Sequence, residues 1–231
     1  MGDYQTIRVA DGEFKAYVAR PSAAKAPAVV VIQEIFGVNK VMRDITDGLA
    51  GQDYLAICPD LFWRIEPGID ITDHSKEEWA RAFELFNAFK VDTGVQDIAA
   101  TVDQIRQDPA CSGKVGAVGF CLGGLLAFLT ACRTSADATV SYYGVGLDNV
   151  IAEARSCTKP IMLHIAEEDG FVNKAAQAAI IAAVEGQSNV TVHTYPGRDH
   201  AFARVGGEHY NEADAMKAGQ RSLDFFKQHL G

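Results

Sequence analysis

Short apolar runs alternate with amphipathic stretches along the chain, and this pattern predicts its secondary structure. Residues 6–10 and 14–19 flank Asp11-Gly12 and predict an antiparallel hairpin. The β-branched run at 28–32 has the length and composition of a strand buried on both faces. The first part of the chain is therefore expected to form a hairpin at a sheet edge followed by a buried strand.

Later strands alternate with helices. Strands are predicted at 54–58, 114–120, 138–143, 160–166 and 190–195, and helices at 41–50, 76–90, 93–107, 172–185 and, from Met216, to the end of the chain. This alternation predicts an α/β fold, a doubly wound, mostly parallel sheet with helices on both faces and an N-terminal antiparallel hairpin. No linker or repeat divides the sequence, so we expect a single domain spanning 1–231.

The stretch 114–130 contains the strongest chemical signal. An apolar run of strand length ends in Gly-Phe-Cys-Leu-Gly-Gly at 119–124, and an apolar run of helix length follows directly. This is the form of a nucleophile elbow, in which the central residue sits on a strained turn between strand and helix. A thiol at a helix N-terminus lies at the positive end of the helix dipole, which favours the thiolate. Cys121 is therefore the predicted nucleophile, although most cysteines only pack in cores.

Four polar residues follow strands of the predicted sheet. They are Glu34, Cys121, Asp169 and His200, and the carboxyl ends of parallel strands meet at one sheet edge where ligands bind. The order nucleophile, acid, histidine is that of α/β-hydrolase triads. Asp169 would orient His200, and His200 would carry a proton between the thiol and the leaving group. Glu167 and Glu168 remain alternatives for the acid.

Two backbone N–H groups are expected to stabilise the developing oxyanion. The elbow supplies that of Leu122, and the loop after Glu34 supplies that of Ile35. Phe36 in the same loop and Tyr142 at a later strand end are predicted to contact the substrate. The aromatic stripe that includes Trp79 is either core packing or a wall of the pocket.

The charge and cysteine content of the chain limit the classes of partner that it is expected to bind. With 21 basic and 30 acidic residues the net charge is −9, which argues against nucleic acid or an anionic membrane as partner. Five cysteines without C-x-x-C spacing indicate neither a disulfide framework nor a metal site, so we expect a cytoplasmic protein without metal or cofactor. No signal peptide or membrane-spanning run is recognised. We expect a monomer or weak homodimer that acts on small molecules.

Five motifs together resemble the dienelactone hydrolase (carboxymethylenebutenolidase) family. They are Q-E-I-F-G-V-N at 33–39, C-P-D-L-F at 58–62, G-F-C-L-G-G at 119–124, Y-Y-G-V-G-L at 142–147 and D-H-A-F-A-R at 199–204. The resemblance implies an α/β-hydrolase fold and a cysteine hydrolase that opens small carboxylate-bearing lactones or enol esters, with dienelactone converted to maleylacetate.

The resemblance also implies residue roles. It assigns Cys121, Asp169 and His200 as the triad, and Arg204 as a substrate-binding arginine. Glu34 would contact Arg204 and accept the Cys121 proton when an anionic substrate recruits that arginine.

The chain departs from the family pattern on the helix at 76–90. The family's second arginine aligns with Trp79, and Arg81 lies two residues further on, about 200° around the helix. The family tyrosine on this helix aligns with Phe83. Both Trp79 and Arg81 are therefore candidates for substrate contact.

Three alternatives remain open. The protein is a general carboxylesterase on neutral esters, a non-catalytic small-molecule binding module on the same fold, or a redox sensor at Cys121. No cysteine close to Cys121 in sequence offers a resolving thiol, so the last is the weakest.

Overall fold

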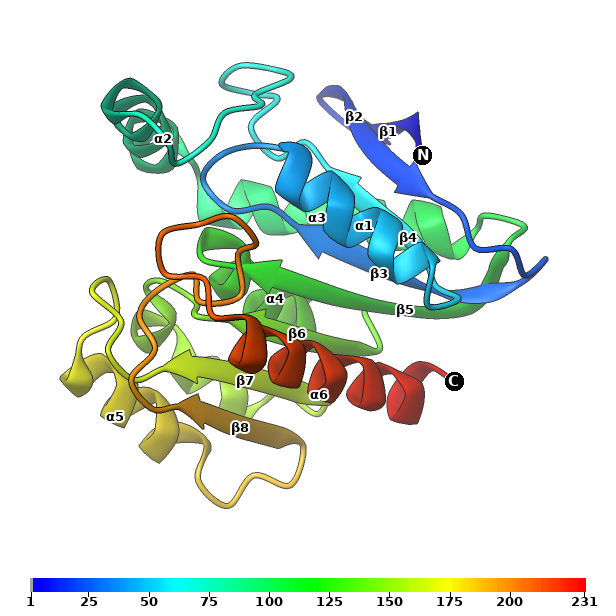
Figure 1. Ribbon diagram of the computed structural model, residues 1–231. Helices are drawn as coiled ribbons and strands as arrows, with labels where there is room; N and C mark the ends of the chain where they lie inside the picture. Colours follow the sequence, from blue (N-terminus) through cyan, green and yellow to red (C-terminus); the bar gives the residue numbers. More distant parts are fainter. Residues whose placement is uncertain (1) are drawn as a thin grey trace.

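A computed structural model describes residues 2–231. One sheet contains all eight strands, in the order β1-β2-β4-β3-β5-β6-β7-β8 (Figure 1). The strands are β1 (Asp3–Val9), β2 (Gly12–Ala19), β3 (Ala26–Ile32), β4 (Leu55–Pro59), β5 (Cys111–Phe120), β6 (Ala138–Tyr142), β7 (Ile161–Ala166) and β8 (Val190–Tyr195). The pairs from β4 to β8 are parallel, and β1 and β2 are antiparallel to their neighbours. The predicted α/β fold with its N-terminal hairpin is confirmed.

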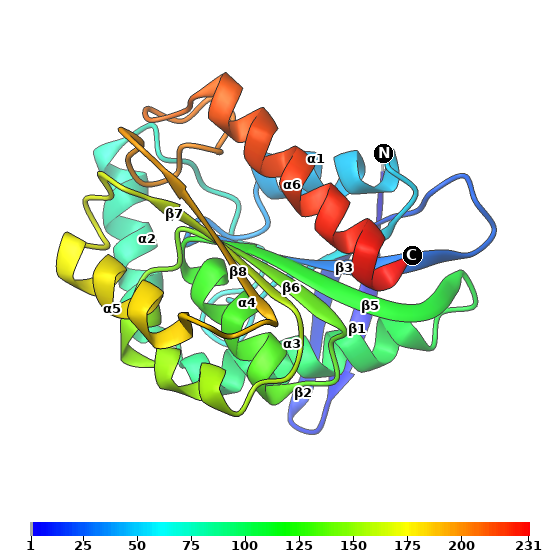
Figure 2. The same ribbon diagram turned by 90° about the horizontal axis from the view of Figure 1, so that it is seen from below.

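The helices lie on both faces of the sheet. They are α1 (Lys40–Ala50), α2 (Lys76–Ala88), α3 (Val91–Arg106), α4 (Leu122–Arg133), α5 (Lys174–Val184) and α6 (Glu212–Leu230). Figures 1 and 2 show α1 and α6 on one face and α3, α4 and α5 on the other. Helix α2 stands apart from the sheet, at the end where the parallel strands finish (Figure 1).

The apolar composition of the central strand and helix follows from their burial. Strand β3 is almost entirely inaccessible, as its β-branched run requires between two helical layers. Helix α4 is apolar on every side and buried over nearly its whole length, because it lies between the sheet and neighbouring helices. These two elements are the rigid support on which the site described below is built.

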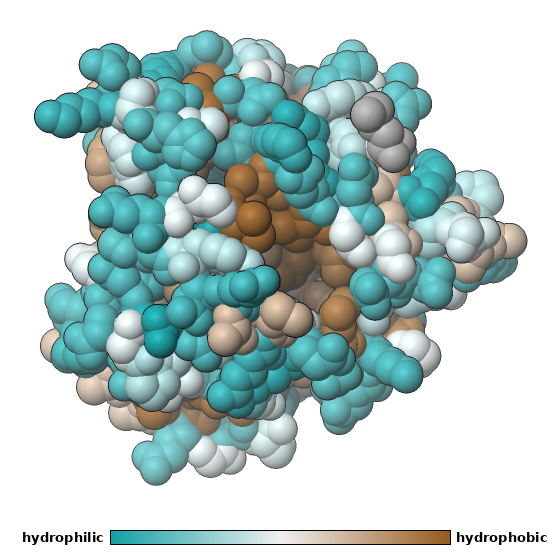
Figure 3. All heavy atoms as spheres, in the orientation of Figure 1, coloured by the Kyte–Doolittle hydropathy of each residue, from teal (hydrophilic) through white to brown (hydrophobic). Residues whose placement is uncertain are grey.

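Between α1 and α6 the helical layer leaves an apolar hollow, visible as the brown depression in Figure 3. Its volume is about 250 Å³, and Leu49, Phe120, Leu223 and Phe226 contribute to its lining. The hollow lies against the middle of the sheet.

Two short 3-10 helices were not predicted. They are η1 (Leu147–Asn149) and η2 (Ile151–Arg155), and they follow β6 in the loop that leads to β7. Strand β6 ends at Tyr142, one residue earlier than predicted, because Tyr143 has a left-handed backbone with φ 39°. In residues 2–231, no helix has the length and apolar character needed to cross a membrane.

Candidate active site

The turn from β5 to α4 holds Cys121 in a strained conformation. Its φ is 57° and its ψ is −116°, a region that residues with a Cβ rarely adopt. The Cys121 N–H donates to the carbonyl of Tyr142 at 3.1 Å, and the Cys121 carbonyl accepts from the Leu125 N–H. These backbone bonds tie the turn to β6 on one side and to α4 on the other.

Glycines permit this turn because its backbone segments approach very closely. A Cβ at Gly119 would lie 1.8 Å from the carbonyl oxygen of Gly123. A Cβ at Gly123 would lie 2.3 Å from the carbonyl oxygen of Ile32 and 2.5 Å from that of Gln33. The start of α4 therefore packs directly against the end of β3.

Two backbone N–H groups, those of Leu122 and Ile35, are near the junction of β3 and α4. Leu122 is the first residue of α4, so its N–H has no acceptor within the helix. Ile35 is buried just beyond the end of β3, next to the carbonyls that Gly123 approaches. The Leu122 N–H lies at the positive end of the α4 dipole, and the assignment of Leu122 and Ile35 as oxyanion donors stays a prediction.

Asp169 and His200 form a buried pair beyond the ends of β7 and β8. The Nδ1–H of His200 donates to Oδ2 of Asp169 at 2.9 Å. The other carboxylate oxygen, Oδ1, accepts the N–H groups of Phe171 and Val172 at 2.8 and 3.1 Å, which fixes the carboxylate. Glu168 instead binds Lys174 at the surface, so the structure pairs Asp169 with the histidine.

Cys121 lies close enough to His200 to influence its protonation. Burial alone would lower the pKa of His200. Negative charge on Cys121 and the hydrogen-bonded Asp169 outweigh burial and raise the pKa of His200 to about 10. A protonated imidazole beside a thiolate is the arrangement that cysteine-dependent acyl transfer needs.

Arg204 and Glu34 form a second buried pair. The arginine Nε and Nη2 donate to the two carboxylate oxygens of Glu34 at 2.7 and 3.1 Å. Burial opposes the positive charge, but the neighbouring Glu34 carboxylate outweighs it and raises the pKa of Arg204. The Glu34 carboxylate that the sequence placed at a strand end is therefore paired with a permanent cation.

A second acidic residue, Asp73, also contacts Arg204, and the sequence analysis did not predict it. Nη1 of Arg204 donates to Oδ2 of Asp73 at 2.7 Å. Asp73 belongs to the irregular loop before α2, two residues ahead of the Ser75 N-cap. That position was the only sequence feature that set Asp73 apart from the rest of the loop. The loop thus reaches across to the arginine that follows β8.

Aromatic rings wall this region. The guanidinium of Arg204 lies over the ring of Phe36, 4.9 Å from its centroid. Phe36 in turn meets Trp79 edge to face, with ring centroids 5.1 Å apart. Trp79 therefore contributes to the wall beside Arg204 as well as to packing.

Two predicted substrate contacts are not brought into this cluster. The Tyr142 hydroxyl bonds to Ser222 on α6 at 2.7 Å, because its side chain points to the opposite face of the sheet from α4. Arg81 forms ion pairs with Glu66 and Glu84 at the surface, since it lies on a different side of α2 from Trp79. Both predictions are corrected.

Tyr143, and not Tyr142, has its ring beside His200. Its ring centroid is 5.0 Å from that of His200, and its left-handed backbone turns the side chain toward the site. Its buried hydroxyl has no hydrogen-bond partner within residues 2–231. Burial, followed by the charge of Glu34, raises the pKa of Tyr143, so the phenol remains a hydrogen-bond donor. The two adjacent tyrosines in the sequence indicated that one of them lies near the site, but the sequence did not show which ring faces it.

Across the described part of the chain, residues 2–231, no three His, Cys, Asp or Glu side chains are grouped so that they can hold a metal ion.

Comparisons with known proteins agree on one family. The model of the dienelactone hydrolase family matches residues 14–230. A protein of Azospirillum brasilense, provisionally named carboxymethylenebutenolidase, is 53 % identical over 96 % of both chains. The carboxymethylenebutenolidase of Pseudomonas putida is 38 % identical over 95 % of this chain and 94 % of its own. A solved structure from Klebsiella pneumoniae, provisionally titled dienelactone hydrolase, is 25 % identical, covers 99 % of both chains and has a TM-score of 0.87.

Proposed function

The chain belongs to the dienelactone hydrolase family and hydrolyses ester or lactone bonds, and from this premise we propose that it opens small lactones or enol esters that carry a carboxylate. Dienelactone opened to maleylacetate is the type reaction. The observation that carries the proposal is the buried pair of His200 and Asp169, together with the effect of Cys121 on His200 and the buried arginine Arg204.

In the proposed first step, the Cys121 thiolate attacks the carbonyl carbon of the lactone or ester. The carbonyl π electrons move to oxygen, and the N–H groups of Leu122 and Ile35 stabilise this oxyanion. When the tetrahedral intermediate collapses, the bond to the enol oxygen breaks and His200 donates its proton to that oxygen. The product of this step is a thioester on Cys121.

Hydrolysis of the thioester reverses the proton path. His200, now neutral, takes a proton from water, and the resulting hydroxide attacks the thioester carbonyl. Collapse expels the Cys121 thiolate and releases the free acid. Asp169 keeps the imidazole oriented in both steps and stabilises its protonated form.

Arg204 is assigned to the substrate carboxylate, because a guanidinium binds carboxylates through two well-oriented donors. Glu34 anchors Arg204 in the free protein. We assign it a second role for molecules in which Cys121 is still a neutral thiol: as the guanidinium turns toward a bound carboxylate, Glu34 accepts the thiol proton. Tyr143, with its unpartnered hydroxyl, is the further donor available to the substrate.

A second candidate is a general carboxylesterase that acts on small neutral esters. The supporting observation is the apolar wall formed by Trp79 and Phe36, together with the surface position of Arg81. With Arg81 outside the site, Arg204 is the one cation within residues 2–231 that pairs with Glu34. Such a site favours a neutral acyl group more than a site with two arginines would.

Steady-state hydrolysis of cis- and trans-dienelactone beside p-nitrophenyl acetate tests both candidates. We expect the wild type to prefer the anionic lactones, and Cys121→Ser to lose at least about 1,000-fold in kcat on every substrate. Cys132→Ser, the same chemical change at the far end of α4, is the matched control and should keep full activity. Turnover of the neutral ester alone would favour the carboxylesterase, and full activity of Cys121→Ser would overturn the mechanism.

A further inference from the structure

Arg204 has two acidic partners, and the proposed reaction uses only one of them. Glu34 accepts two hydrogen bonds from the guanidinium, through Nε and Nη2. Asp73 accepts one, from Nη1, at 2.7 Å. Nη1 is the end of the guanidinium that Glu34 leaves free, so Asp73 occupies the position that a substrate carboxylate would need.

The two carboxylates differ in how firmly they are held. The Glu34 side chain is 2 % exposed and follows the central strand β3, so without Arg204 it would be a buried, uncompensated charge. The Asp73 side chain is 11 % exposed and belongs to a surface loop. Its neighbour His74 is 70 % exposed, and the two side chains approach within 3.6 Å. Asp73 is therefore the partner that can move into water at the smaller cost.

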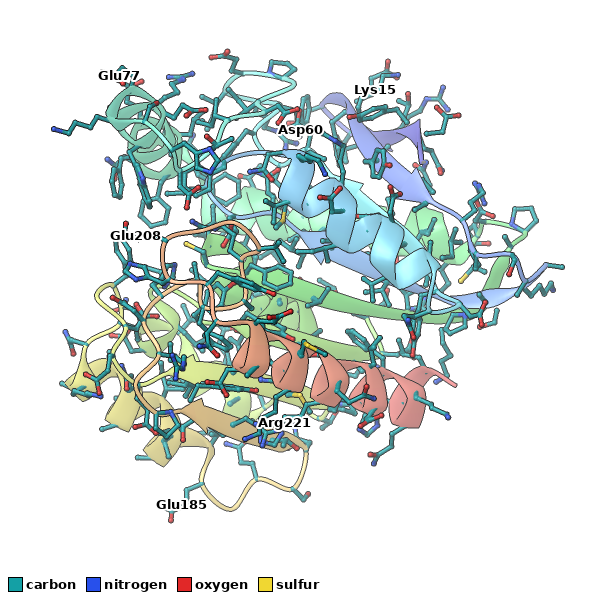
Figure 4. All side chains as sticks on the ribbon, in the orientation of Figure 1. Lys15, Asp60, Glu77, Glu185, Glu208 and Arg221 are labelled. Atoms are coloured by element: carbon teal, nitrogen blue, oxygen red, sulfur yellow. The ribbon has the colours of Figure 1, made fainter. Side chains whose placement is uncertain are left out.

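The loop is nevertheless built to place Asp73 where it lies. Glu78 accepts hydrogen bonds from Thr72 and Ser75, and Ser75 in turn caps α2. The indole N–H of Trp79 donates to the Asp73 carbonyl at 3.0 Å. Figure 4 shows α2, marked by Glu77, and the loop after β8, marked by Glu208, at the same end of the sheet. The start of α2 is thus preorganised over Arg204.

The net charge around Arg204 indicates whether a substrate carboxylate binds in addition to Asp73 or replaces it. One guanidinium with two carboxylates carries a net charge of −1, and a third carboxylate would bring it to −2 in a largely buried place. Replacing Asp73 by an incoming carboxylate leaves the net charge unchanged. Exchange at Nη1 is therefore the favoured route for an anionic substrate.

On the basis of the proposed function, we propose that Asp73 determines specificity by acting as an internal competitor for the substrate carboxylate. In the free protein its carboxylate fills the anion site on Arg204. Anionic substrates must displace it, which weakens their binding, whereas neutral esters bind without displacing it. Asp73 acts through Arg204 and takes no part in bond making or breaking.

Calorimetric titration with 2-furoate and 2-furamide tests the proposal. The two probes have the same ring and differ in charge, and neither contains a bond that the protein is proposed to cleave. In Asp73→Asn, which keeps the shape of the side chain, we expect the Kd of furoate to fall about tenfold relative to the wild type. The Kd of furamide should change by less than about twofold. In turnover, KM for the anionic lactone should fall, and kcat/KM for p-nitrophenyl acetate should stay constant.

Asp70→Asn is the matched control, because Asp70 lies in the same loop and pairs with Arg43 away from the site. It removes the same charge and should leave both Kd values unchanged. Equal shifts for furoate and furamide in Asp73→Asn, no shift in either, or no furoate binding to either protein would overturn the proposal. Because the probes are not hydrolysed, this result is independent of Cys121, whose replacement tests the proposed function separately.

Discussion

The protonation state of His200 determines which half of an acyl transfer it can assist. Charge on Cys121 and the hydrogen bond to Asp169 raise its pKa to about 10 against the opposing effect of burial. In the proposed mechanism the imidazole is therefore protonated at neutral pH and can donate to the leaving group. It becomes a base only after it has given that proton away, which matches the order of the two proposed steps.

We expect the His200 ring to remain protonated through neutral pH and to titrate near pH 10 in the wild type. NMR of ring-labelled histidine measures this directly. Because the folded pKa lies above the ordinary value of 6.5, the proton stabilises the fold fully below about pH 6.5. This contribution is lost as the pH rises toward 10.

The Cys121→Ser variant removes the charge that contributes most to this shift, so the pKa of His200 should fall. His229 on α6 is the internal control, because burial lowers its pKa and it lies outside the site. Its titration should be the same in both proteins. A His200 ring that titrates near 6.5 in the wild type would contradict the ion pair.

At the scale of elements, the junction of β5, the Cys121 turn and α4 depends on contact between backbones. Replacing Gly123 with Ala puts a Cβ 2.3 Å from the Ile32 carbonyl oxygen, and no flexible side chain is available to move aside. We expect a loss of at least about 3 kcal/mol in the free energy of unfolding, measured by urea denaturation.

The matched control is Gly219→Ala on α6, where an added Cβ meets no atom within 4 Å. Removing a helical glycine there should stabilise the protein by about 0.5–1 kcal/mol. If Gly123→Ala unfolded at the wild-type urea concentration, the start of α4 would not pack against the end of β3 as described.

Most elements could be predicted from the sequence because burial determines which of their positions are apolar. Strand β3 and helix α4 are apolar on all sides, and α6 has one apolar face, so each has a distinct pattern over enough residues. The helices η1 and η2 are three and five residues long, too short for a period to appear. The end of β6 was misplaced because one left-handed residue, Tyr143, ended it.

At the scale of the whole molecule, the sheet topology explains why the location of the candidate site could be predicted from the sequence. It does not determine which side chains point into that site. Parallel strands finish at one edge, so residues after β3, β5, β7 and β8 had to meet there. The direction of each side chain does not follow from the sheet topology. Tyr142 and Tyr143 differ by one position and face opposite sides, and Arg81 faces away from Trp79. Asp73 lies in a loop without periodicity, so only coordinates could pair it with Arg204.

The hairpin at the sheet edge is tied to the rest of the molecule by charges. Arg64 contacts Asp11 at the hairpin turn and Asp97 on α3, and Asp97 also accepts the indole N–H of Trp63 at 3.0 Å. The Asp97 side chain is 2 % exposed. Arg64 thus connects the hairpin turn and α3 through Asp11 and Asp97.

Because Asp97 is buried, its removal should affect global stability. We expect Asp97→Ala to lower the free energy of unfolding by about 3 kcal/mol, the lower end for a broken buried ion pair, since Arg64 keeps Asp11 and reaches water. Asp92→Ala on the same helix is the control. Its side chain is 84 % exposed and pairs with Arg133, so its loss should cost less than about 1 kcal/mol. Equal urea midpoints for the two variants would mean that the Arg64–Asp97 pair adds nothing to the strand pairing and packing that hold the hairpin.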